Sequence, residues 1–225
     1  MSGFYIKINV AKNDKGMGKL NAKEFWNQRA ANYDATSGKN YAEAYQKTID
    51  LTCRYVTSED KLLAFACGTG IVSNAIAANV QFVTGIDISD KMIAVAQQKA
   101  KQDGVENISY IVANLEDAEI QAGNHTIITA FNVLYFLEDL DEKLKLIYDM
   151  LPENGYFLSV TDCVRKEKGL KLLFRSLLLR FKKVPYFRHL TPEELTFHIE
   201  KAGFKIVQIE NLYPEPPNLY VAAKK

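Results

Sequence analysis

Two glycines and one acid near the middle of the chain have the residue types and the spacing of a nucleotide site. Gly68 and Gly70 lie in a turn directly after the apolar run 62–65. Glycine has no Cβ, so it adopts positive φ readily and lets the backbone approach a bound group. A helix beginning after this turn would offer unpaired N–H groups and its positive dipole end to a carboxylate or a phosphate. A Gly-Thr-Gly turn alone is equally consistent with a plain tight turn, so the residues that follow must decide.

The acid supplies the second part of the pattern. Asp87 comes directly after the next apolar run, 81–86, and lies 17 residues beyond Gly70. A carboxylate at a strand end with this spacing reaches both hydroxyls of an adenosine ribose. Asp87 would also suit a helix N-cap or an exposed surface position. Its place after a strand and beyond the glycine turn favours the ribose role.

The elements that must position these residues alternate regularly along the chain. We expect strands and helices at 61–66, 71–78, 81–86, 90–102, 108–112, 126–131, 140–150 and 156–161, then a helix at 193–202 and strands at 204–211 and 219–223. Near-continuous apolar strands between amphipathic helices predict a parallel sheet covered on both faces. The last two strands have no helix between them and must pair antiparallel. The predicted fold is therefore α/β, doubly wound and Rossmann-like, with an antiparallel C-terminal hairpin strand.

Segments outside this core divide the chain further. Residues 1–20 read as a flexible leader with a strand-like stretch at 4–10, and residues 21–225 as one domain. Within it, 21–56 is expected to form a helical cap, with Asn21 capping a helix at 22–33 and a second helix at 41–56. Residues 163–190 form a basic amphipathic insert. Its stretch 165–183 suits a solvated helix, a pocket wall, an acidic partner or a membrane surface.

Composition excludes several classes of function. The net charge of +1 gives no overall field for nucleic acid, so we expect no DNA partner and disfavour an RNA acceptor. Three distant cysteines without a CxxC pair argue against a disulfide framework or a cysteine zinc site. No apolar run is long enough to span a bilayer, and the expected location is the cytoplasm. The histidines (His125, His189 and His198) are expected at the surface, and no metal site is predicted.

Five motifs in register make the chain resemble the class I S-adenosylmethionine-dependent methyltransferases, especially those acting on small molecules. The motifs are residues 24–34, 66–70, 85–89, 132–137 and 151–156, and the resemblance covers nearly the whole chain. It implies a seven-stranded sheet with a reversed terminal hairpin. It also implies S-adenosylmethionine as cofactor and in-line methyl transfer to a small acceptor.

The resemblance also implies roles for particular residues. The turn Ala66, Cys67, Gly68, Thr69 and Gly70 would hold the methionine part of the cofactor. Asp87 would bind the ribose, Ile88 would lie against the adenine, and Asn114 and Leu115 would face the adenine edge. Asn132 would lie beside the sulfonium, and Tyr33 would close over the site.

The sequence says less about how the acceptor is bound. Because a sulfonium methyl is already activated, the enzyme mainly holds a nucleophile in line and excludes water. If a base is needed, Tyr135, Tyr33 and His189 are candidates. Aromatic residues of the cap and the insert suggest a flat or hydrophobic acceptor, with Trp26, Tyr41, Tyr135 and Tyr186 as contact residues.

Three positions depart from the family pattern. Ala64 stands where the family usually has an acid, Ala66 where it has glycine, and Asn114 where it has aspartate. These changes are consistent with weaker cofactor binding, an altered cofactor or a catalytically silent relative. The retained acid Asp87 and both turn glycines favour an active enzyme.

Two other classes of function stay open at this stage. The first is a non-catalytic adenosyl-nucleotide module that contacts a partner or membrane through its basic helix. The second is a dinucleotide oxidoreductase, disfavoured because no third glycine follows Gly70 at the usual place. The oligomeric state cannot be inferred from these patterns.

Overall fold

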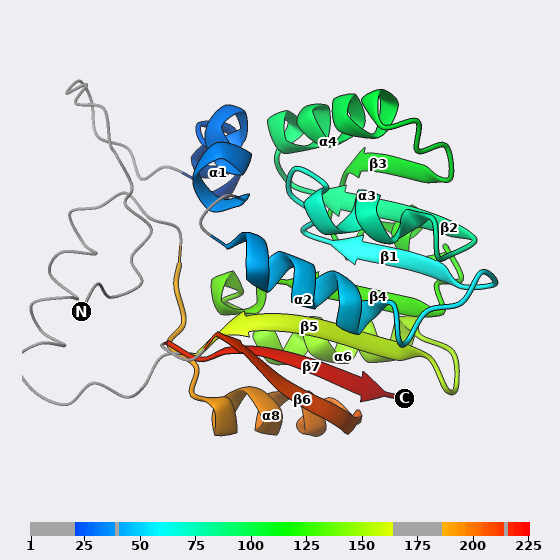
Figure 1. Ribbon diagram of the computed structural model, residues 1–225. Helices are drawn as coiled ribbons and strands as arrows, with labels where there is room; N and C mark the ends of the chain where they lie inside the picture. The colour runs from blue at the N-terminus through cyan, green and yellow to red at the C-terminus, as the bar shows by residue number, and fades with distance from the viewer. Residues whose placement is uncertain (1–20, 39–40, 164–185, 214–215) are drawn as a thin grey trace, which may run out of the picture.

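The computed structural model describes residues 21–38, 41–163, 186–213 and 216–225 and contains one seven-stranded sheet. The strands are β1 (Lys61–Phe65), β2 (Phe82–Asp87), β3 (Ile108–Val112), β4 (Ile127–Phe131), β5 (Tyr156–Asp162), β6 (Lys205–Tyr213) and β7 (Asn218–Lys224). Their order is β3-β2-β1-β4-β5-β7-β6. The first five strands are parallel, and β7 is antiparallel to both β5 and β6 (Figure 1). The predicted fold class is confirmed.

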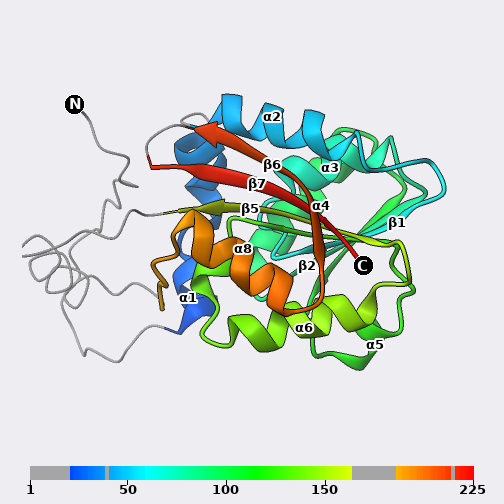
Figure 2. The same ribbon diagram turned by 90° about the horizontal axis from the view of Figure 1, so that it is seen from below.

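Helices cover both faces of the sheet. One layer contains α2 (Ala42–Thr52), α3 (Ile71–Ala77) and α4 (Asp90–Gln102); the other contains α5 (Ala118–Gln121), α6 (Leu140–Met150) and α8 (Pro192–Lys201) (Figures 1 and 2). Side chains of β1 alternate between the two layers, since successive strand residues point to opposite faces. Leu62 packs in the cluster with α2 and α3, whereas Leu63 packs with α6 and α8. This double burial explains why the parallel strands are nearly continuous apolar runs.

The N-terminal cap is less regular than predicted. The expected helix at 22–33 is two short pieces, α1 (Ala22–Asn27) and the 3₁₀ turn η1 (Ala30–Asn32), and the π-helical turn η2 (Asp34–Gly38) follows them. Asn21 caps α1 as predicted, its Oδ1 accepting from Glu24 N at 2.8 Å. After Trp26 the backbone bonds span three residues instead of four, as in Arg29 N to Trp26 O at 3.0 Å. The tighter winding ends the α-helix early.

Other boundaries differ modestly. The predicted second cap helix at 41–56 is shorter, because α2 ends at Thr52. The loop predicted over 114–123 contains α5, and a 3₁₀ turn, η3 (Leu134–Phe136), follows β4. Such short helices carry too few residues for a clear periodic signal. The predicted strand-like stretch at 4–10 and the basic stretch 165–183 lie outside the described residues. No helix in the described ranges is long and apolar enough to cross a membrane.

The turn between β1 and α3 has an unusual backbone. Gly68 and Gly70 adopt φ of 57° and 75°, as the sequence predicted, and Ala66 adopts φ of 53°. This left-handed region costs a residue with a Cβ about 1–2 kcal/mol. At Gly70 an added Cβ would also meet the Tyr110 hydroxyl. The turn therefore requires glycine at Gly70 and carries strain at Ala66.

His125 contradicts the expectation that the histidines lie at the surface. It precedes β4 and is 5% exposed. Burial lowers the pKa of its imidazole, because the charged form is poorly solvated there. His189 is exposed and His198 lies 2.5 Å from Asp141 through its Nδ1. The burial of His125 comes from tertiary packing, which its local sequence does not reveal.

We predict that Ala66→Gly stabilises the protein by about 1 kcal/mol, because glycine removes the Cβ strain at less entropic cost. Chemical denaturation measures the change in the free energy of unfolding. The matched control is Ala64→Gly in the preceding strand β1, where extended backbone gains nothing from glycine, so that variant loses stability. A loss of stability in both variants would contradict the strain at Ala66.

We also predict that stability falls as the pH drops below about 6.5, where the unfolded chain binds a proton that folded His125 resists. Urea unfolding of the wild type and of His125→Phe at pH 7.5 and 5.5 tests this. The wild type should lose more stability than the variant over this interval. His189 and His198 are common to both proteins, so equal losses would show that His125 does not cause the dependence.

Candidate active site

The carboxyl ends of β1, β2, β4 and β5 lie at one edge of the sheet, on the side of α1 (Figure 1). Here the two predicted halves of the site meet directly. Gly68 N donates to Asp87 Oδ2 at 3.0 Å, and Ser89 N donates to Asp87 Oδ1 at 2.8 Å. One carboxylate thus joins the turn after β1 to the turn after β2.

Asp87 is a buried carboxylate, 9% exposed. Burial raises its pKa, and the two backbone N–H groups oppose that shift by stabilising the charged form. A carboxylate has about four lone-pair sites, and these two bonds use two of them. Asp87 therefore retains capacity to accept hydrogen bonds from a ligand's hydroxyls.

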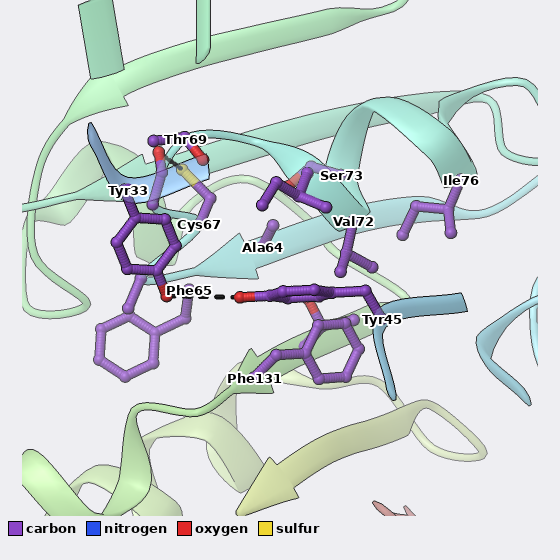
Figure 3. Close-up of a pocket in the computed structure, with 14 residues that line it drawn as sticks. Tyr33, Tyr45, Ala64, Phe65, Cys67, Thr69, Val72, Ser73, Ile76 and Phe131 are labelled. Atoms are coloured by element: carbon purple, nitrogen blue, oxygen red, sulfur yellow. Dashed lines mark hydrogen bonds between the residues drawn. The ribbon is translucent and has the colours of Figure 1, made fainter. Parts of the chain in front are cut away.

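A cavity of about 60 Å³ lies against the turn, on the side of the cap. Its walls come from the turn itself, from β1, α3 and β4, and from two tyrosines of the cap (Figure 3). The hydroxyls of Tyr33 and Tyr45 are 3.4 Å apart and lie across the cavity. The sequence placed Tyr33 over the turn, whereas it placed Tyr45 only among the aromatic cap residues expected near an acceptor.

The cap is attached to both loops by polar side chains. Asp34 accepts from Thr69 Oγ1 at 2.5 Å and pairs with Lys99 of α4 at 2.7 Å. Asn27 Oδ1 accepts from Ser89 Oγ at 2.5 Å. These contacts hold Tyr33 next to the turn. Asn27 and Asp34 both lie in the motif 24–34, but no sequence pattern predicted these contacts, because Asp and Asn are common surface residue types.

The residues expected around the adenine differ in exposure. Ile88 is half-buried beside Asp87, whereas Asn114 is exposed and its N–H donates to Asp117 Oδ2 at 2.9 Å. The side chain of Leu115 is fully buried in the core, so it cannot face a ligand at the strand edge. Ala113 N donates to Asp87 O at 3.2 Å, which places this loop beside the end of β2.

Two of the four expected acceptor contacts, Trp26 and Tyr135, lie in one aromatic group. Trp26 lies 5.3 Å from Phe136 and 6.3 Å from Tyr33 between ring centroids. Tyr135 lies 4.5 Å from Phe136 and 5.1 Å from Phe187. The sequence identified Trp26, Tyr33 and Tyr135 but not Phe136.

The other two expected acceptor contacts lie differently. Tyr41 precedes α2, and burial and the charge of Asp162 raise its pKa. Tyr186 is 42% exposed, with the Arg188 guanidinium over its ring. Nothing among the ring contacts of the described residues connects Tyr186 to the aromatic group.

Three hydrogen-bonded polar side chains lie at this end of the sheet. Asn218 Nδ2, from β7, donates to Asp162 Oδ1 at 2.6 Å and to Asn132 Oδ1 at 3.3 Å. Asn132 adopts φ of 56° at the end of β4, which Asn tolerates better than most residues. Sequence reasoning identified Asn132 but missed Asp162 and Asn218. Within the described ranges, no group of three or more His, Cys, Asp or Glu side chains is arranged for a metal ion.

Comparison with known proteins agrees with this geometry. A family model described as a methyltransferase domain matches residues 63–159. A curated relative from Acinetobacter baumannii (strain AYE), named ubiquinone biosynthesis O-methyltransferase, is 26% identical over 161 residues, covering 69% of this chain and 68% of the relative.

Solved structures share the fold. The N-methyltransferase NodS from Bradyrhizobium japonicum WM9, solved with S-adenosyl-L-homocysteine, has a TM-score of 0.69 at 16% identity, covering 90% of this chain and 97% of NodS. An S-adenosylmethionine-dependent methyltransferase from Mesorhizobium loti has a TM-score of 0.63 at 18% identity, covering 81% and 98%.

The family match, the curated relative and the strand order favour the methyltransferase interpretation over both alternatives left open by the sequence. Residues 63–159 match a methyltransferase domain, and the chain shares the fold of solved S-adenosylmethionine-dependent methyltransferases.

Proposed function

We propose that this enzyme methylates a hydroxyl group on a small aromatic or hydrophobic molecule. The observation that carries the proposal is the bond between Gly68 N and Asp87 Oδ2, which puts bare backbone and a ribose-type acid side by side. The aromatic group around Trp26, Tyr135 and Phe136 supplies a surface for a flat acceptor. Oxygen is proposed as the methylated atom because the curated relative is named as an O-methyltransferase.

The residues present fit the adenosyl cofactor. A Cβ added at Gly68 would have no other heavy atom within 4 Å, so the turn leaves open space for a bound group. In the proposal, residues 66–70 bind the methionine part, Asp87 binds the ribose and Ile88 contacts the adenine. Asn114 and the backbone of Leu115 recognise the adenine edge, and Asn132 lies near the reacting centre. The bound cofactor supplies a methyl group already activated by the adjacent positive sulfur.

The protein itself positions the acceptor and excludes water. The cavity of about 60 Å³ is much smaller than ordinary ligand sites of about 300–1,000 Å³. We therefore propose that the cap segment carrying Tyr33 and Tyr45 moves outward to admit the cofactor and then closes. Closure would hold the acceptor in line and keep bulk water away from the reacting atoms.

We also propose that residues 21–225 act as one methyltransferase domain, with 21–56 as its cap. Contacts from Asp34 and Asn27 to the loops after β1 and β2 support this, because they join the cap to the cofactor side of the sheet. Membrane contact through 165–183 remains a prediction, since that stretch lies outside the described residues.

We predict that Gly68→Ala abolishes or strongly weakens binding of S-adenosylhomocysteine, because the new methyl group fills the space where the amino-acid part of the ligand would lie. Isothermal titration calorimetry measures the affinity. Gly104→Ala is the matched control: Gly104 has φ of 68° and likewise no heavy atom near an added Cβ, but it lies in the turn after α4.

Both variants should lose about 1–2 kcal/mol of stability from the left-handed backbone. Only Gly68→Ala should lose affinity. Unchanged affinity in Gly68→Ala would remove the turn from the cofactor site, and absence of binding by the wild type would overturn the proposed cofactor.

A further inference from the structure

A third acid lies at the site edge of the sheet, besides Asp34 and Asp87. Asp162 is the last residue of β5 and is partly buried. It follows Leu158 and Val160 at alternate positions, and both pack in the cluster with α2. Alternate strand residues share a face, so the Asp162 side chain lies on the face that α2 covers.

The neighbours of Asp162 connect it to the reacting centre. Asn218 lies directly opposite Asp162 in the antiparallel β5–β7 pair. Its amide donates to Asp162 Oδ1 at 2.6 Å and to Asn132 Oδ1 at 3.3 Å. Asn132 is the residue that the proposed function places near the sulfonium. One side chain therefore separates Asp162 from that position.

The groups facing Asp162 are mainly hydroxyls. Its charge contributes to the raised pKa values of Tyr41 and Tyr135, which come from the start of α2 and from η3. Tyr33 and Tyr45 also face Tyr135 from the cap, and burial raises the pKa of each. These phenols stay protonated at neutral pH, so they can donate hydrogen bonds but are not bases.

The nearby thiol and the other acids do not compete as bases either. Burial raises the pKa of the Cys163 thiol to about 12, and Glu193 of α8 lies on the side of Cys163. Asp34 is paired with Lys99 and Thr69, and Asp87 accepts from Gly68 and Ser89. Burial raises the pKa of Asp162, which makes its carboxylate a stronger base than an exposed aspartate.

We propose that Asp162 is the general base of the reaction and that Asn218 holds it in place. This inference rests on the proposed function, because it assumes a neutral hydroxyl on the acceptor. Asp162 accepts the proton of that hydroxyl while the acceptor's oxygen forms the new bond to the methyl carbon. The bond between that carbon and sulfur breaks, its electron pair stays on sulfur, and Asp162 then releases the proton to water.

The test compares the wild type with Asp162→Asn, using labelled S-adenosylmethionine and a panel of substituted phenols as acceptors. The variant's amide oxygen still accepts from Asn218, so the fold is expected to survive, and thermal unfolding checks this. We expect kcat to fall about 100-fold or more for weakly acidic phenols, as for loss of a general base. For nitrophenols, which ionise near neutral pH, the defect should be much smaller. Affinity for S-adenosylhomocysteine should stay within about twofold, since Asp162 is not proposed to bind the cofactor.

Two further measurements separate a base from a structural role. The wild-type rate should rise with pH through the raised pKa of Asp162, and Asp162→Asn should lack that rise. Asp162→Glu should recover part of the activity, and Asp139→Asn, at the start of α6, is the control that keeps full activity. A fall in kcat of equal size for all phenols would overturn the role of Asp162. A wild-type rate that does not rise with pH would overturn it as well. A wild type that binds the cofactor but methylates none of the phenols would overturn the proposed acceptor class and this inference with it.

Discussion

The interaction on which the site depends is the pair of hydrogen bonds that the Asp87 carboxylate accepts from Gly68 N and Ser89 N. A buried carboxylate is costly unless hydrogen-bonded, so these two bonds stabilise both the charge and the loops that donate them. Because β1 and β2 are parallel neighbours, their carboxyl ends are adjacent and a single side chain can span them. The glycine turn thus owes its position to the same acid that is proposed to bind the ribose.

Polar side chains of the cap also bind the two loops that meet at Asp87. Asp34 binds Thr69 and Lys99, and Asn27 binds Ser89, so polar contacts tie the cap to both loops that meet at Asp87. Such contacts are individually modest, and an exposed ion pair contributes about 0–1 kcal/mol. This is compatible with a cap that opens and closes. The aromatic group and the Asp162–Asn218 pair then lie on the proposed acceptor side of the same end of the sheet.

The sequence allowed most of the framework to be predicted, because buried parallel strands and amphipathic helices leave strong periodic patterns. The helix Asp90–Gln102 was predicted to the residue. The 3₁₀ and π turns before α2 were not, since their winding depends on how Tyr33 and Asp34 meet the turn after β1. Asp162 and Asn218 were missed for a related reason. Their surroundings arise from strands and helices distant in sequence, and neither belongs to a recognisable motif.

The most direct measurement is a crystal structure of the protein with S-adenosylhomocysteine. The account predicts that both ribose hydroxyls lie within hydrogen-bond distance of Asp87 and that the amino-acid part of the ligand lies against the backbone of Gly68. It also predicts that Tyr33 and Tyr45 have moved apart from their present 3.4 Å contact. A ligand bound elsewhere, or a ribose that does not contact Asp87, would contradict the central claim.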